Sequence, residues 1–111
     1  MRTIQQTALE TAVLDRLHEL YRARGFPPAR SIRALRRENT GDGRYVELES
    51  EARVQMDDGY IDLGGSFIEM KGLPNGMMAV VLVKDKHLTT LELTVYGGDS
   101  WDGEEREWKI V

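Results

Sequence analysis

Apolar residues recur at spacings of three and four near the start of the chain, over residues 4–24. They place one apolar face on a helix, formed by Leu9, Val13, Leu17, Leu20 and Tyr21, with Ile4, Ala8 and Ala12 beside it. Thr3 followed by Gln6 has the spacing of a capping box. Gly25 and the two prolines that follow are a typical helix stop. The pattern predicts one long amphipathic helix over residues 4–24.

Beyond the prolines the period shortens to two. Residues 32–37 alternate weakly between apolar and polar, and residues 45–48 restart the alternation after the dense turn signal at residues 39–43. These segments predict a hairpin. Further extended segments follow at residues 60–63, 67–70, 77–83, 88–96 and 108–110.

The segment Met77–Val83 is a continuous apolar run, which predicts a central strand buried on both faces. Reversals are expected before it at Pro74–Gly76 and after it at Lys84–His87. In the second reversal Asp85-Lys86 stands where Asp-Gly would be typical. Residues 105–110 are expected to pair with residues 88–96, and the intervening residues 97–104 to form an acidic, mobile tip.

One helix followed by strands joined by short turns predicts an α+β fold. We expect one long N-terminal helix packed on a largely antiparallel sheet of five to seven strands, as a single domain over residues 1–111. The predicted core brings Leu9, Val13, Leu17 and Leu20 of the helix against Val81 and Val83 of the sheet.

Charge divides the chain unevenly around its net value of −4. Residues 1–44 carry nine arginines and five acids, giving +4, whereas residues 45–111 carry six bases and fourteen acids, giving −8. The acidic body favours a basic partner and disfavours nucleic acid. We interpret the arginines of residues 22–44 mainly as intramolecular partners for acids on neighbouring strands, with Arg33, Arg36 and Arg37 as the candidates.

Several chemistries find no support in the sequence. There is no cysteine, and the lone His18 and His87 are interpreted as a solvated helix residue and a turn residue. The aspartate-rich turns lack calcium-loop spacing, and the glycines do not lie between a strand and a following helix, so no metal, nucleotide or other cofactor is expected. No apolar run approaches the ~18 residues of a membrane helix, and the N-terminal residues lack a signal-peptide pattern. We expect a cytoplasmic protein without a membrane partner.

The segment LTTLELTVYGGDSWDGE holds the candidate binding residues. With period two, Glu92 lies on the face opposite Leu91 and Leu93, so it need not enter the core. Exposed aromatic rings among carboxylates are typical of an interface anchor with an acidic rim. The predicted partner-binding residues are Glu92, Tyr96, Asp99, Trp101, Asp102 and Glu104.

Three stretches carry a resemblance to a known group of proteins: Asn39–Tyr45, the apolar strand ending Val83-Lys84-Asp85, and Leu88–Gly97 with Trp101. Over residues 36–108 the chain resembles small uncharacterised bacterial proteins, some of which look like immunity partners of polymorphic toxins. The resemblance implies a protein-binding role and brings no catalytic residues.

Two functions therefore stay open. The first is a non-catalytic protein-binding domain, of the kind that inhibits a basic toxin, with a homodimer as a further possibility. The second is a small-ligand-binding or enzymatic domain with a pocket between helix and sheet, in which Glu69 and Glu92 would be paired carboxylates with separated pKa values. The residues favour the non-catalytic interpretation.

Overall fold

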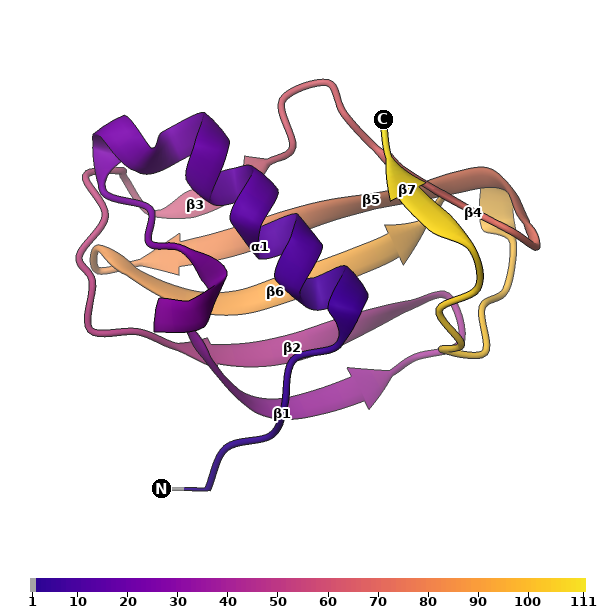
Figure 1. The fold of residues 1–111 in the computed structure, drawn as a ribbon, viewed down its shortest axis with the longest axis horizontal. Coiled ribbons are helices and arrows are strands. Elements are labelled where there is room, and N and C mark those ends of the chain that lie inside the picture. The colour runs from indigo at the N-terminus through magenta and orange to yellow at the C-terminus, as the bar shows by residue number, and fades with distance from the viewer. Residues whose placement is uncertain (1) are drawn as a thin grey trace.

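The structure is a computed structural model that describes residues 2–111 (Figure 1). One α-helix, α1 (Ala8–Tyr21), packs on a seven-stranded antiparallel sheet, which confirms the predicted α+β fold. The strands are β1 (Arg33–Asn39), β2 (Gly43–Glu49), β3 (Gly59–Asp62), β4 (Ile68–Met70), β5 (Leu73–Lys84), β6 (His87–Val95) and β7 (Trp108–Ile110). Short 3₁₀ helices are η1 (Arg22–Arg24), η2 (Ala29–Ser31) and η3 (Tyr96–Gly98).

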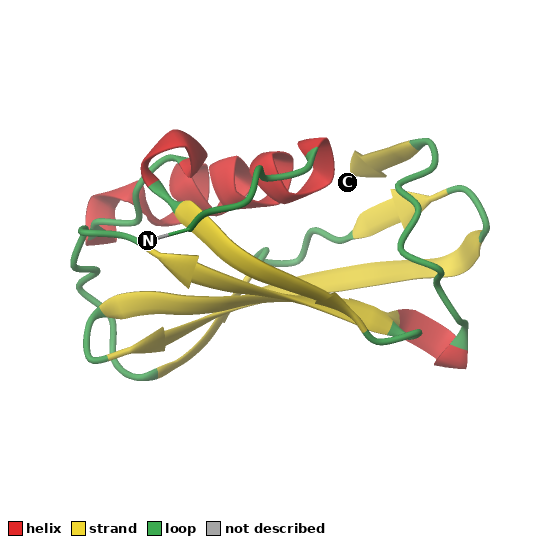
Figure 2. Ribbon diagram, turned by 90° about the horizontal axis from the view of Figure 1, so that it is seen from below, coloured by secondary structure: helices red, strands yellow, loops and turns green. Residues whose placement is uncertain are grey.

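Two layers result, and they are easiest to see from the side (Figure 2). The helix covers one face of the sheet, which we call the inner face. The opposite face, here the outer face, carries no helix in this view apart from η3 at one end (Figure 2). Because an antiparallel strand directs alternate side chains to opposite faces, each long strand contributes both to the core and to the bare surface.

The helix begins later than predicted. The Thr7 side chain accepts a hydrogen bond from Glu10 N (3.1 Å), and Thr7 N donates to Glu10 Oε1 (3.0 Å), which is a complete capping box. The cap predicted at Thr3 is wrong because the residues before Thr7 are drawn onto the sheet edge. There Ile4 N donates to Ala34 O at 2.9 Å.

The predicted inner stripe of the helix is largely confirmed. Leu9, Val13 and Leu17 are all fully buried and belong to one core cluster with Val81 and Val83. Leu20 was placed with them wrongly, since it is 46% exposed. It lies in the last turn of α1, next to Gly64 in the loop that follows β3, where no strand covers it.

Strands join in the order β1-β2-β6-β5-β4-β7, and β3 pairs with the other end of β5. The predicted hairpin of β1 and β2 is confirmed. The predicted pairing of residues 105–110 with β6 is wrong, because β2 and β5 occupy the two sides of β6. Strand β7 pairs instead with β4, with Ile110 opposite Ile68.

Strand β5 differs from its prediction in two ways. It begins at Leu73, so Pro74–Gly76 lies inside the strand, and the chain reverses before it at Lys71-Gly72. Its burial alternates. Met77, Ala79, Val81 and Val83 are buried on the inner face, whereas Met78, Val80 and Leu82 are only half-buried. A strand buried on both faces was expected, but the helix covers one face alone.

The reversal between β5 and β6 lies where it was predicted. Asp85 and Lys86 both have positive φ, 50° and 66°, as the two central residues of a type I′ turn require. Glycine usually provides this conformation, so here two contacts help to hold it. Asp58 Oδ1 accepts from Asp85 N at 2.8 Å, and Lys86 Nζ donates to Met56 O at 3.2 Å.

Candidate protein-binding surface

A cluster of four charged side chains lies under the N-terminal end of α1, on the inner face. Glu10 is fully buried and Arg44 is 3% exposed. The Glu10 carboxylate accepts from Arg37 Nη2 (2.6 Å) and Nε (2.7 Å) and from Arg44 Nη1 (3.1 Å), and Arg44 Nη1 also donates to Glu105 Oε2 (2.6 Å). Two carboxylates face two guanidiniums, so the buried charges compensate one another. The geometry is that of a structural clamp.

Sequence reasoning missed Glu10 and Glu105 as members of this cluster. The spacing Thr7-x-x-Glu10 is a capping-box signal that would have identified Glu10, but the capping box is predicted from the sequence at Thr3 and Gln6 instead. Intramolecular pairing of the arginines was predicted. It is confirmed for Arg33 with Glu49 (3.0 Å) and for Arg36 with Glu47 (3.8 Å). The expectation for Arg37 is wrong in its partner, because Arg37 reaches the helix and not a neighbouring strand.

Trp101 was predicted as an exposed interface anchor, and that exposure is wrong. The residue is 3% exposed, and its Nε1 donates to Glu104 O at 2.8 Å. The Arg44 guanidinium lies 4.7 Å from the centre of its ring. Trp101 N also donates to Gly41 O in the β1–β2 turn (2.8 Å), so the segment expected to be a mobile tip is fastened to the fold. A cation–π contact with a buried arginine explains why this ring points inward.

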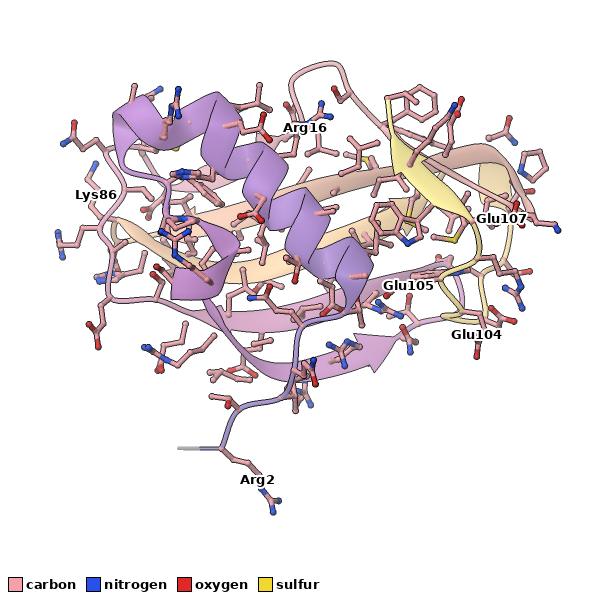
Figure 3. The ribbon with its side chains drawn as sticks, viewed as in Figure 1. Arg2, Arg16, Lys86, Glu104, Glu105 and Glu107 are labelled. Carbon is pink, nitrogen blue, oxygen red and sulfur yellow. The ribbon has the colours of Figure 1, made fainter. Side chains whose placement is uncertain are left out.

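The acidic residues of the same loop remain near the surface. Asp102 receives two hydrogen bonds from Arg106 (2.9 and 2.7 Å), and these hold the pKa of its carboxyl well below the usual range. Asp99 accepts from Asn75 Nδ2 at 3.3 Å. Figure 3 shows Glu104 at the periphery, whereas Glu105 lies beside the start of α1. The loop is therefore an ordered acidic rim.

The outer face carries the largest exposed aromatic side chains. Tyr45 on β2 is 48% exposed, Tyr60 on β3 is 60% exposed, and Tyr96 in η3 is 42% exposed. Half-buried apolar side chains lie between them on β5, those of Met78, Val80 and Leu82. Tyr96 and Met78 also line a hollow of about 230 Å³ at the gap between β3 and β4. Exposed tyrosines around an apolar strip are typical of protein interfaces.

Glu92 occupies the centre of this surface. It lies directly opposite Tyr45 on β2 and opposite Val80 on β5, so the three side chains share the outer face. The Glu92 carboxylate raises the pKa of the Tyr60 hydroxyl, first through its charge and then through a hydrogen bond. The sequence correctly placed Glu92 away from the core, since Leu91 and Leu93 on either side are buried. The sequence did not predict that Tyr45 and Tyr60 would be neighbours of Glu92.

The β1–β2–β6 part of the outer face is acidic. It holds four carboxylates and two guanidiniums, those of Glu38, Glu47, Glu49 and Glu92 and of Arg33 and Arg36. Three of the carboxylates take part in the ion pairs Arg33–Glu49, Arg36–Glu38 and Arg36–Glu47. The excess of negative charge favours approach of a basic molecule.

Glu69 and Glu92 are not brought together. Glu69 pairs with Lys109 Nζ at 3.5 Å and borders a hollow of about 660 Å³ with Phe67, Pro74 and Trp108, and Glu92 does not line that hollow. The group whose pKa Glu92 raises is the Tyr60 hydroxyl, not a second carboxylate. The paired-carboxylate arrangement that acid–base chemistry would need is therefore missing from this hollow.

Among residues 2–111, no group of three or more metal-ligating side chains comes together. No helix in the described part of the chain is both long and apolar enough to cross a membrane. No family model, curated protein or solved structure matches this chain. The chemistry of the outer face is therefore the basis for a functional proposal.

Proposed function

We propose that the chain is a non-catalytic protein-binding domain that docks a basic protein on the outer face of its sheet. The observation that carries the proposal is the set of three exposed tyrosines, Tyr45, Tyr60 and Tyr96, around Glu92 on a bare sheet face. Tyrosine provides a large contact area at a low cost in side-chain entropy, and burial of such rings often dominates binding energy.

Charge supports a basic partner over other occupants. The outer face and the ordered rim with Asp99, Asp102 and Glu104 are both acidic, which raises the rate of association with a positively charged protein. The same charge repels nucleic acid phosphates and a second copy of the same acidic face. A homodimer through this face is therefore disfavoured.

Inhibition of a basic toxin is the specific role that we propose for this docking. A cationic active site is a common feature of enzymes that cleave nucleic acid, and an acidic domain that covers such a site would exclude the phosphate backbone. The proposal follows the resemblance of residues 36–108 to small uncharacterised bacterial proteins, some of which look like immunity partners of polymorphic toxins. We propose a cytoplasmic location for the same reason. Inhibition then needs no catalytic group in this chain.

Affinity capture with matched variants tests the proposal. The wild type, an outer-face variant (Tyr45→Ser with Tyr60→Ser) and a distant control (Lys109→Gln) are each immobilised and exposed to extract from the source cell. We expect one basic protein to be retained by the wild type and the control, and its affinity for the outer-face variant to fall at least ~10-fold.

Equal capture by all three proteins would show that another surface binds, and the proposal would be wrong. A small metabolite that raises the melting temperature, without any protein partner, would support the alternative of a small-ligand-binding or enzymatic domain. Circular dichroism of each variant checks that the fold is intact.

A further inference from the structure

Glu92 differs in its partners from the outer-face carboxylates of β1 and β2. Glu38, Glu47 and Glu49 each form an ion pair with an arginine of β1. None of the ion pairs among residues 2–111 includes Glu92, although this residue lies at the centre of the sheet. Its negative charge is thus available to a cation from outside the molecule.

Aromatic rings flank this carboxylate. Tyr45 is its direct cross-strand neighbour on β2, where Cβ atoms lie roughly 4.5–5.5 Å apart. Val80 on β5 is the neighbour of Glu92 on the opposite side from Tyr45. Tyr60 on β3 is opposite Leu82, which is two residues beyond Val80 on β5. The Glu92 carboxylate is the main cause of the raised pKa of the Tyr60 hydroxyl, so the two groups lie on the same part of the outer face. Both rings are about half exposed, so their faces remain accessible.

The inner face of the same sheet shows which side chain fits such a site. There the Arg44 guanidinium stacks on Trp101 and donates to the carboxylates of Glu10 and Glu105. A planar guanidinium suits this combination because it stacks on an aromatic face and donates forked hydrogen bonds at its edge. Lysine presents a compact charge and lacks the planar face.

We propose that Tyr45, Glu92 and Tyr60 form a subsite for one arginine side chain of the basic partner. The guanidinium stacks on a tyrosine ring and donates to the Glu92 carboxylate, while Val80 contacts the arginine methylenes. This subsite rests on the proposed function, since it specifies how the outer face recognises a basic protein. Hydrogen bonds from the guanidinium to the Glu92 carboxylate would join two ionised groups, which makes them strong.

An NMR titration with N-acetyl-arginine amide tests the subsite on the full chain. This probe has a single charge, on its guanidinium. We expect saturable shifts of the backbone amides at Tyr45, Tyr60 and Glu92. The citrulline analogue has nearly the same shape without the charge and should leave these signals unmoved, and the lysine analogue should bind at least several-fold more weakly.

Two carboxylate variants provide the matched comparison. Glu92→Gln should weaken binding of the arginine probe ~10-fold or more, whereas Glu47→Gln, on the same face but paired with Arg36, should change it less than ~2-fold. Tyr60→Phe keeps the ring and should retain binding, while Tyr60→Leu should lose most of it. The amide spectrum of each variant shows whether it is folded.

The subsite is wrong if Glu92→Gln binds the probe as well as the wild type, if citrulline binds equally, or if the shifts occur on another surface. Equal binding of lysine would overturn the assignment to arginine. These results are separable from the proposed function. If the probe fails while the variant Tyr45→Ser with Tyr60→Ser still loses the captured protein, only the subsite is wrong.

Discussion

The two faces of the sheet use the same kinds of side chain in opposite ways. On the inner face, Arg44 stacks on Trp101 and pairs with Glu10, which is fully buried, and with Glu105, which is mostly buried. On the outer face, the next residue along β2, Tyr45, lies exposed beside Glu92. Inside, the ring and the carboxylates share one guanidinium, whereas outside no guanidinium pairs with Glu92.

The difference follows from what covers each face. Helix α1 and the segment with Trp101 remove water from the inner group, and a buried charge without a partner would cost several kcal/mol, so every charge there is compensated. Water solvates the outer group and makes an uncompensated Glu92 tolerable. Stability therefore depends on the inner residues, and the outer ones are free to serve binding.

The largest expected effect comes from breaking the buried cluster. Arg44→Met removes a guanidinium that contacts both Glu10 and Glu105 and leaves buried carboxylate charge with less compensation. We expect the free energy of unfolding to fall by about 3–5 kcal/mol. Urea denaturation of the wild type and the variant measures this difference in unfolding free energy.

The matched control for Arg44→Met is Arg36→Met on the outer face. The Arg36 side chain is 72% exposed and pairs with Glu38 and Glu47 at 3.6 and 3.8 Å. Here the expected loss is below about 0.5 kcal/mol. A similar loss of unfolding free energy for both substitutions would contradict the conclusion that stability depends on the inner face and not on the outer face.

Two leucines, one on each side of the sheet, test the difference in stability between the inner and outer faces without changing any charge. Leu17 of α1 is fully buried, so Leu17→Ala should cost about 2–5 kcal/mol of unfolding free energy through lost burial and a residual cavity. Leu82 on the outer face of β5 is half-buried, and Leu82→Ala should cost about 1 kcal/mol or less. Thermal and urea denaturation report both values. A loss below about 1 kcal/mol for Leu17 would place it outside the core.

Two glutamates of the C-terminal segment give a smaller effect. The Glu105 carboxylate accepts from Leu9 N (3.2 Å) and from Arg44 Nη1, so it fastens the segment to the start of α1. Glu105→Gln should lower the free energy of unfolding by about 1–3 kcal/mol. Glu107 is 80% exposed and points outward (Figure 3), so Glu107→Gln should have no measurable effect. Equal effects would mean that Glu105 is not part of the clamp.

Local patterns in the sequence correctly predict the elements that depend on local spacing. Period two places Leu91 and Leu93 inside and Glu92 outside, and the helix stripe identifies Leu9, Val13 and Leu17. The failures depend on contacts between distant segments. The start of α1 is decided by the pairing of Ile4 with Ala34, and the partner of β7 by the occupied sides of β6.

The candidate site shows the same limit. Trp101 and Tyr96 are close in the sequence and equally aromatic, yet one is buried and the other is exposed. The inward Trp101 ring contacts the Arg44 guanidinium of a distant strand, and Trp101 N donates to Gly41 O, contacts that local spacing does not specify. Tyr45 and Tyr60 become neighbours of Glu92 through the strand order β2-β6-β5, with β3 on the far side of β5, and no local pattern in the chain specifies that order.

The smallest expected effect is a change in titration, and it concerns Tyr60. The charge of Glu92 is the largest cause of the raised pKa of the Tyr60 hydroxyl, and a hydrogen bond to Glu92 is the second. Glu92→Gln removes the charge, so the pKa of Tyr60 should fall toward the ordinary value near 10. The pKa of Tyr21 is raised mainly by burial and then by Asp62, and should not move. NMR of the tyrosine Cζ atoms follows both residues.

The sign of the pH dependence follows from the direction of the shift. Because folding raises the pKa of Tyr60, the protonated hydroxyl is favoured in the folded state, and this contribution to stability is fully present below the unfolded pKa, near 10. It is lost as the pH rises through the folded pKa, and Glu92→Gln should remove that alkaline loss. An unchanged Tyr60 titration in the variant would show that the hydroxyl and the carboxylate are apart in solution. The outer face would then keep Tyr45 as the aromatic neighbour of Glu92 and lose Tyr60 from that group, which would weaken its parallel with the inner cluster.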